Sequence, residues 1–137
     1  QAENFCNELG ESLSGRLMPA VDVSMNLLEK AFKPGAGELK EDLQAFIDHV
    51  SQKYDCGVII ICDKSSYEDY IGADFAGYPV WVKSTVKSVD FTDDWDIWQY
   101  SDSGKTECYE NSDKHYPQLV AAQSVTVEQF KEQFLIE

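Results

Sequence analysis

The sequence predicts an α/β fold with about five mainly parallel strands and flanking helices. The first observation is that the strand candidates are continuous apolar runs, such as residues 58–62, rather than alternations of apolar and polar residues. The second is that helical patterns separate the early strands. Continuous apolar strands are typical of parallel sheets buried on both faces, so helices are expected to cover this sheet.

The order of elements follows from periodicity and from breakers. Strands are expected at residues 17–23, 58–62, 78–83, 96–100 and 119–122, and helices at 2–9, 25–32, 38–53, 65–71 and 127–135. The helix over 38–53 has the clearest pattern, because its apolar residues recur at spacings of three and four and acids crowd its first turn. Pro19 lies near the start of the first strand, where a missing N–H is tolerated.

Length and charge limit the classes of partner. The 137 residues are expected to form a single domain over residues 1–137, and the 43% hydrophobic content supports a folded core. A formal net charge of −14 disfavours nucleic acid and anionic membranes as partners, whereas a neutral or cationic partner fits. No apolar run approaches the ~20 residues that span a bilayer, and no signal peptide is visible.

The four cysteines do not indicate a metal site. They contain no CxxC pair, and the chain has only two histidines, so we expect no metal and no cofactor. Cys56 and Cys62 flank one extended segment of about 20 Å and cannot bridge to each other. A bridge between Cys62 and Cys108 and a set of free buried thiols, which would include Cys6, both remain open, and free thiols are favoured.

Six segments, in order, carry a family resemblance. The strongest reads WDIWQYSDSGK over residues 95–105, and the others are QAENF at 1–5, LMPAVDV at 17–23, FI at 46–47 with GVIII at 57–61, YPVWV at 78–82 and VTVEQF at 125–130. Together these segments resemble the family 25 glycoside hydrolases, the bacterial and phage lysozymes (muramidases). The resemblance implies a TIM-barrel-like (β/α) fold that is incomplete, because the segments match about strands four to eight and a full barrel needs about 200 residues.

The resemblance also implies a substrate and a place for the site. The implied partner is peptidoglycan or a related glycan, and a secreted or cell-surface location is favoured. In barrels of this kind the site lies at the carboxyl ends of the strands. The family's catalytic strand typically ends in Asp-x-Glu, whose carboxylates share one side of the strand. Here the strand ends with Asp22, which matches the aspartate, and Ser24, which stands in the place of the glutamate.

The serine removes the expected proton donor. Glycosidic cleavage needs an acid to protonate the leaving oxygen, and a serine hydroxyl cannot replace it. General acid–base help is typically worth 10²–10⁴-fold, so we expect little or no hydrolysis. Asp63 is a nearby acid that could substitute, and we regard that as the weaker alternative. Asp22 itself is either a retained sugar contact or a carboxylate that only bonds backbone at a strand end.

Three aromatic residues are candidate substrate contacts. Trp81, Trp98 and Tyr100 lie on predicted strands, where they either pack in the core or stack on sugar rings. Trp98 and Tyr100 share one strand face, and Gln99 points the other way. Tyr100 ends its strand at the expected rim, which favours a ligand role for it.

Three hypotheses follow for the function. The first is a lysozyme-like domain that has lost hydrolysis and retains glycan binding. The second is part of an active lysozyme that missing N-terminal strands complete. The third is a non-catalytic assembly module, in which a partner chain or a second copy completes the barrel, because unpaired strand edges rarely stay bare.

Overall fold

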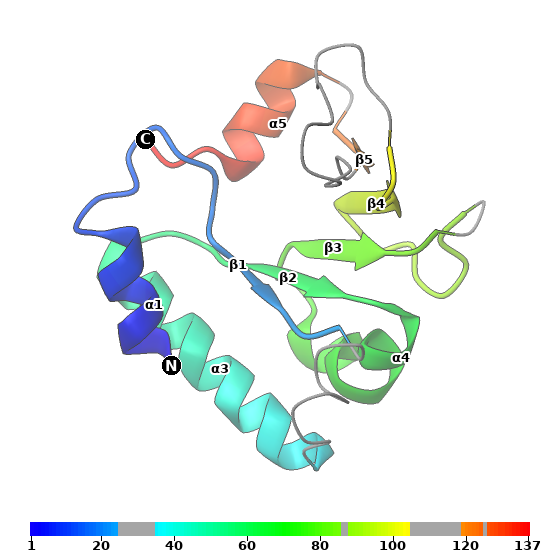
Figure 1. Cartoon of the computed structure of the whole chain (residues 1–137), viewed down its shortest axis with the longest axis horizontal. Helices are drawn as coiled ribbons and strands as arrows, with labels where there is room; N and C mark the ends of the chain where they lie inside the picture. The colour runs from blue at the N-terminus through cyan, green and yellow to red at the C-terminus, as the bar shows by residue number, and fades with distance from the viewer. Residues whose placement is uncertain (25–34, 86–87, 105–118, 125) are drawn as a thin grey trace.

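A computed structural model (Figure 1) describes residues 1–24, 35–85, 88–104, 119–124 and 126–137 of the chain. Its single sheet has the strand order β1 (Ala20–Asp22), β2 (Ile59–Cys62), β3 (Val80–Lys83), β4 (Ile97–Ser101) and β5 (Leu119–Ala122). The first four strands are parallel, and β5 runs antiparallel to β4. The predicted α/β fold with five mainly parallel strands is confirmed.

The helices agree with the predicted order. They are α1 (Ala2–Leu9), α3 (Ala36–Tyr54), α4 (Lys64–Ser66), the π-helical turn η1 (Tyr67–Ile71), the 3₁₀ turn η2 (Gly72–Phe75) and α5 (Val127–Phe134). The helix expected at 25–32 lies outside the described residues. The segment predicted as one short helix at 65–71 begins one residue earlier and continues to Phe75 through two irregular turns.

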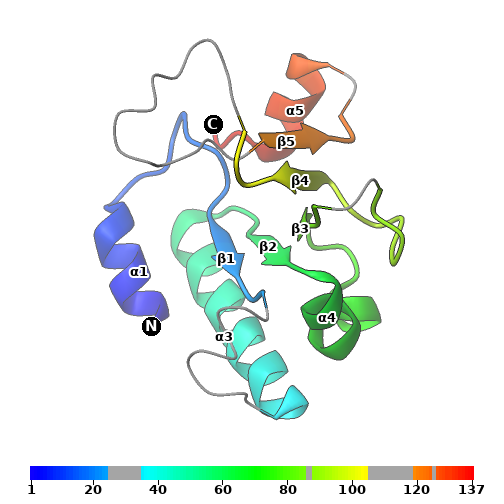
Figure 2. The ribbon, with the colours of Figure 1, turned by 45° about the vertical axis from the view of Figure 1, so that its right-hand side comes forward.

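The first strand is shorter than predicted, and the reason is a second pairing. The N–H of Met18 donates to the carbonyl of Phe134 at 2.7 Å, and Leu17 forms an antiparallel bridge with Leu135. Leu17 and Met18 therefore pair with the C-terminal segment, beside which they lie in Figures 1 and 2, and pairing with β2 begins at Pro19, whose carbonyl accepts from the N–H of Ile59 at 2.9 Å. Leu17, expected in a buried strand, is 52% exposed.

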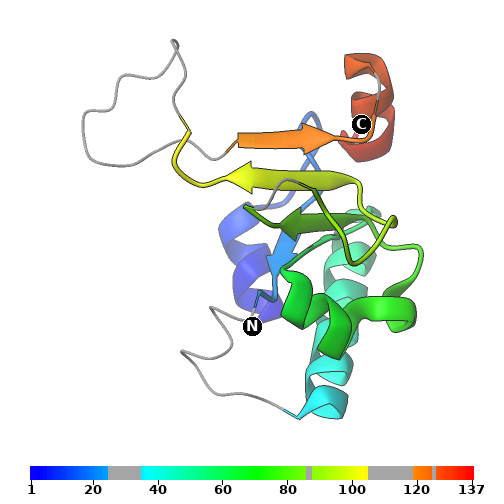
Figure 3. The ribbon, with the colours of Figure 1, turned by 90° about the vertical axis from the view of Figure 1, so that its right-hand side faces the viewer.

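Register divides the sheet into two faces. We call the face with Ile60, Val80 and Val82 the outer face, because these side chains belong to the main core together with α1 and α3. The opposite face, called the inner face, carries Ile59 and Ile97. Figure 3 shows α5 beside β5, at the end of the sheet away from α3.

Two further observations concern cysteines and helix length. Cys6, Cys56 and Cys62 are free thiols, as the favoured alternative predicted. Cys108, the partner considered for Cys62, lies outside the described residues. In the part of the chain that the structure describes, no helix is long and apolar enough to cross a membrane.

The core position of Phe134 gives a first prediction. Its side chain is fully buried against Ile59 and Ile97, so Phe134→Ala should lower the free energy of unfolding by about 3–5 kcal/mol, the usual cost of removing a buried phenylalanine. Val127→Ala on the same helix is the matched control, because Val127 is 64% exposed and should change stability by about 0.5 kcal/mol or less. Urea unfolding of both variants measures the difference, and equal effects would contradict the placement of α5.

Candidate functional site

The carboxyl ends of the parallel strands meet at one edge of the sheet. β1 ends at Asp22, β3 ends at Lys83 and β4 ends at Ser101. A pocket of about 370 Å³ lies past these ends. Its lining comes from four strands or the loops that follow them, and it is polar throughout: Ser24, Asp63, Lys83, Ser84, Thr85, Gln99 and Asp102. The pocket therefore lies where barrels of this kind build their sites.

Strand register explains why these side chains converge. Paired residues of neighbouring parallel strands point to the same face, and Asp22 lies beside Ile61, which lies beside Trp81. Lys83 and Gln99 form the next pair along the same face, because Lys83 is two residues beyond Trp81. The inner face thus carries a carboxylate, an indole, an ammonium group and an amide at its carboxyl edge.

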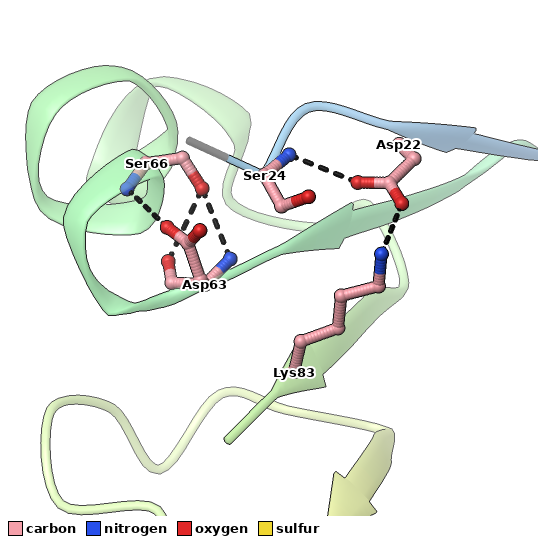
Figure 4. A network of polar contacts seen from close by, with 5 residues as sticks. All are labelled: Asp22, Ser24, Asp63, Ser66 and Lys83. Carbon is pink, nitrogen blue, oxygen red and sulfur yellow. Dashed lines mark hydrogen bonds and ion pairs between the residues drawn. The ribbon is translucent and has the colours of Figure 1, made fainter. Parts of the chain in front are cut away.

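An ion pair joins the first and third strands (Figure 4). Oδ2 of Asp22 accepts a hydrogen bond from the ammonium group of Lys83, and Oδ1 accepts one from the N–H of Ser24 at 2.9 Å. Burial raises the pKa of Asp22, but the hydrogen bonds from Lys83 and Ser24 and the positive charge of Lys83 together outweigh burial, so the pKa is lowered. Asp22 is therefore ionised at neutral pH.

Ser24 stands beside this ion pair and faces the pocket. Its residue is only 3% exposed, and it contributes to the pocket lining. The N–H of Ser24 donates to the side chain of Asp22 two residues earlier, which is the hydrogen bond of an Asx-turn, and β1 ends at this turn. The position that the sequence analysis assigned to the family's glutamate thus holds a buried hydroxyl next to an ionised carboxylate.

The end of β2 supplies an acid and a thiol with different roles. Asp63 caps α4, since its Oδ1 accepts from the N–H of Ser66 at 2.9 Å and the Ser66 hydroxyl accepts from the N–H of Asp63 at 3.0 Å (Figure 4). Cys62 is fully buried on the outer face beside Val82. Burial and the charges of Asp63 and Asp22 raise the pKa of Cys62 to about 12, so the thiol stays protonated at neutral pH.

The three aromatic candidates fall on opposite faces. Trp81 lies on the inner face with Asp22, and its Nε1 is buried without a partner among the described residues. Trp98 lies beside Val82 on the outer face, donates from Nε1 to the carbonyl of Ser84 at 2.7 Å, and contacts Tyr100 edge-on at 5.7 Å between ring centroids. The structure brings Asp22, Ser24 and Trp81 to one face but does not bring Trp98 and Tyr100 to it.

Five pocket residues were missing from the sequence-based candidates: Lys83, Ser84, Thr85, Gln99 and Asp102. Lys83 interrupts the apolar strand β3 two residues after Trp81, so a two-residue periodicity would have placed the two on one face. Gln99 is only 6% exposed, and its Oε1 is buried with no hydrogen-bond partner among the described residues. Its signal was present as well, because it alternates with Trp98 and Tyr100 along β4.

The described residues contain no group of three or more His, Cys, Asp or Glu side chains that could hold a metal ion.

Comparison with known proteins assigns the family. Residues 1–108 match the family model of the glycosyl hydrolases family 25, which covers well over half of the chain. The chain therefore belongs to glycosyl hydrolase family 25, and the family predicted from its motifs is confirmed. A search of curated proteins found no match.

Solved structures show a similar fold. A family 25 glycosyl hydrolase from Bacillus anthracis matches with a TM-score of 0.81 and 23% identity, over 96% of this chain and 60% of that one. The chain thus spans 60% of the length of that hydrolase, and its sheet has a TIM-barrel-like, incomplete form. The CTP1L endolysin also matches, with a TM-score of 0.47 and 19% identity, over 68% of this chain and 32% of that one.

The ion pair yields a prediction about pH. Lys83→Met removes the charge and the hydrogen bond that lower the pKa of Asp22, so this pKa should rise, as a carboxyl NMR titration would measure. In the wild-type protein the lowered pKa stabilises the fold above the usual value of 3.8, and that contribution is lost as the pH falls through the folded-state pKa.

Stability measured against pH checks the same contact. The stability of Asp22→Asn should fall less at acidic pH, because the variant lacks the carboxylate whose lowered pKa contributes to the loss. Asp94→Asn removes an exposed carboxylate elsewhere and should lose stability as the wild-type protein does. Urea unfolding between neutral pH and pH below 3.8 makes the comparison. An Asp22 pKa that stays unchanged in Lys83→Met would show that the two side chains do not interact in solution.

Proposed function

We propose that the chain is a lysozyme-like domain that binds peptidoglycan glycan at the carboxyl edge of its sheet and has lost most of its hydrolytic activity. Family membership supports the substrate class. The observation that carries the loss of hydrolysis is Ser24, a buried hydroxyl in the pocket at the position of the family's glutamate.

The first requirement of glycosidic cleavage is a protonated acid at the leaving oxygen. Asp22 does not meet it, because its lowered pKa keeps it ionised at neutral pH. The hydroxyl of Ser24 is far too weak an acid to replace a carboxylic acid in this role. Asp63, the substitute considered from the sequence, is committed through Oδ1 to the cap of α4.

The second requirement is a negative group that stabilises the oxocarbenium-like transition state. Asp22 carries the charge, but the ammonium group of Lys83 is hydrogen-bonded to it and offsets the field that a sugar would experience. Both parts of the chemistry are therefore weakened at one strand end, although the pocket keeps its polar lining.

Glycan binding needs less than hydrolysis. A pocket of about 370 Å³ has the size of small-molecule sites, and hydroxyl, amide and carboxylate groups line it. These groups can exchange hydrogen bonds with sugar hydroxyls without any proton transfer. Trp81, on the same face, is the aromatic residue that we propose as a sugar contact; Tyr100, 40% exposed at the rim, and Trp98 belong to the outer face.

Part of an active lysozyme is the second candidate function. It is favoured by one observation, that the chain spans only 60% of the Bacillus anthracis hydrolase to which it is similar. The edge of β1 away from β2 is where further strands of a barrel would add, whether from this polypeptide, a partner chain or a second copy. This candidate predicts clearing of cell walls once such strands are supplied.

An assay of hydrolysis and binding tests the proposal. The purified chain should release reducing ends from peptidoglycan at least about 100-fold more slowly than an active family 25 enzyme, the lower bound for losing general acid help. It should nevertheless sediment with insoluble peptidoglycan. Thr85→Trp, which fills the pocket from an exposed lining position, should abolish sedimentation, and Val127→Ser on α5 should retain it.

Two results would overturn parts of this proposal. Turnover comparable to the active enzyme would refute the loss of hydrolysis, and a further loss in Asp63→Asn would then assign the proton donor to Asp63. Sedimentation that Thr85→Trp leaves intact would remove the pocket from glycan binding.

A further inference from the structure

One side-chain atom in the pocket lacks the partner that its burial demands. Oε1 of Gln99 is buried and accepts no hydrogen bond within the described residues, while Gln99 itself is only 6% exposed. Buried polar atoms are nearly always paired, because an unpaired one loses its bonds to water without replacement. An acceptor that lines a pocket and has no partner among the described residues indicates a ligand that donates.

The charges around this atom also favour a donor, and in particular a cationic one. Two carboxylates, Asp63 and Asp102, line the pocket with Gln99. A third, Asp22, is ion-paired with the lining residue Lys83. Among the described lining residues Lys83 is the only basic one, and its ammonium group is hydrogen-bonded to Asp22. Its charge is thereby matched within the ion pair with Asp22 and not by the carboxylate of Asp102. The formal net charge of −14 adds a long-range attraction for cations.

We propose that the pocket prefers a sugar with a free 2-amino group over the same sugar with an N-acetyl group, so that its ligand is a de-N-acetylated stretch of glycan. This inference rests on the proposed glycan-binding function and names the form of glycan that the pocket selects. The protonated amine donates to Oε1 of Gln99 and lies in the field of the carboxylate of Asp102, whereas an acetamide offers one N–H, no charge and a larger group. A hydrogen bond to a charged group is about twice as strong as a neutral one.

Calorimetry with two matched oligosaccharides tests the preference. The probes are tetraglucosamine and tetra-N-acetylglucosamine, at a mildly acidic pH where the amine is protonated. Tetraglucosamine should bind the intact chain roughly tenfold more tightly or better, the difference expected for a charge-assisted hydrogen bond. The preference should shrink in high salt and at a pH where the amine loses its proton.

Variants separate the pocket from the overall charge. Asp102→Asn, at an exposed lining position, should reduce the preference several-fold. Asp94→Asn removes the same charge from a cavity at the opposite end of the strands, and should leave the preference unchanged. Gln99→Met should weaken tetraglucosamine binding. Gln99→Glu keeps the shape of the side chain and adds a negative charge, so it should strengthen binding. This second variant still tests the role of Gln99 if the methionine variant does not fold.

The outcomes distinguish this inference from the proposed function. Equal or tighter binding of tetra-N-acetylglucosamine overturns the amine preference and leaves glycan binding in place. Failure of both sugars and of peptidoglycan overturns the proposed function itself. Binding of hexalysine as tight as that of tetraglucosamine, lost together with it in Asp102→Asn, would identify a cationic peptide site and overturn the assignment to a sugar.

Discussion

The parallel register of β1 to β4 is the constraint on which the rest of this structure depends. A shift of one residue would move every side chain of a strand to the other face. The observed register places Val21, Ile60 and Val80 together in the helix-covered core, and it places Asp22, Ile61 and Trp81 together on the inner face. The same pairing therefore determines both the core and the site. Because the apolar side chains must face α3, the polar side chains of the same strands are placed on the inner face.

The ion pair between Asp22 and Lys83 follows from that register. The two residues belong to strands that are not neighbours, because β2 lies between β1 and β3. Lys83 lies on the same face as Asp22, two residues beyond the position level with it, and its long side chain reaches across β2. The ammonium group removes the electrostatic problem of a partly buried carboxylate, and removal of either partner would leave the other charge uncompensated. The pair therefore holds the ends of β1 and β3 together and keeps Asp22 ionised at neutral pH.

The sequence was sufficient for the fold class and for most elements, because continuous apolar strands and the helical spacing in α3 are local signals. It failed where pairing partners are distant: the start of the first strand was placed too early because the contact of Met18 with Phe134 spans nearly the whole chain. In the site, Asp22 and Ser24 were found through a motif. Lys83 was missed because it directly follows the YPVWV segment, and Gln99 was missed because only the aromatic residues of WDIWQYSDSGK were taken as candidates. Strand periodicity alone could have placed both on the inner face, but their convergence with Asp22 depends on interstrand register, which no local pattern encodes.

The proposed loss of the glutamate does not require loss of the fold, because the core and the pocket are stabilised by different contacts. The main core lies on the outer face, and the smaller cluster around Phe134 lies toward the other end of the strands from the pocket. At the pocket, the described polar groups largely satisfy one another: Asp22 with Lys83 and Ser24, and Asp63 with Ser66. A buried acceptor without a partner lowers stability, so it is not expected in a pocket that has no ligand. Oε1 of Gln99 is a buried acceptor without a partner among the described residues, and it belongs to the pocket lining, where the proposed ligand would supply the donor.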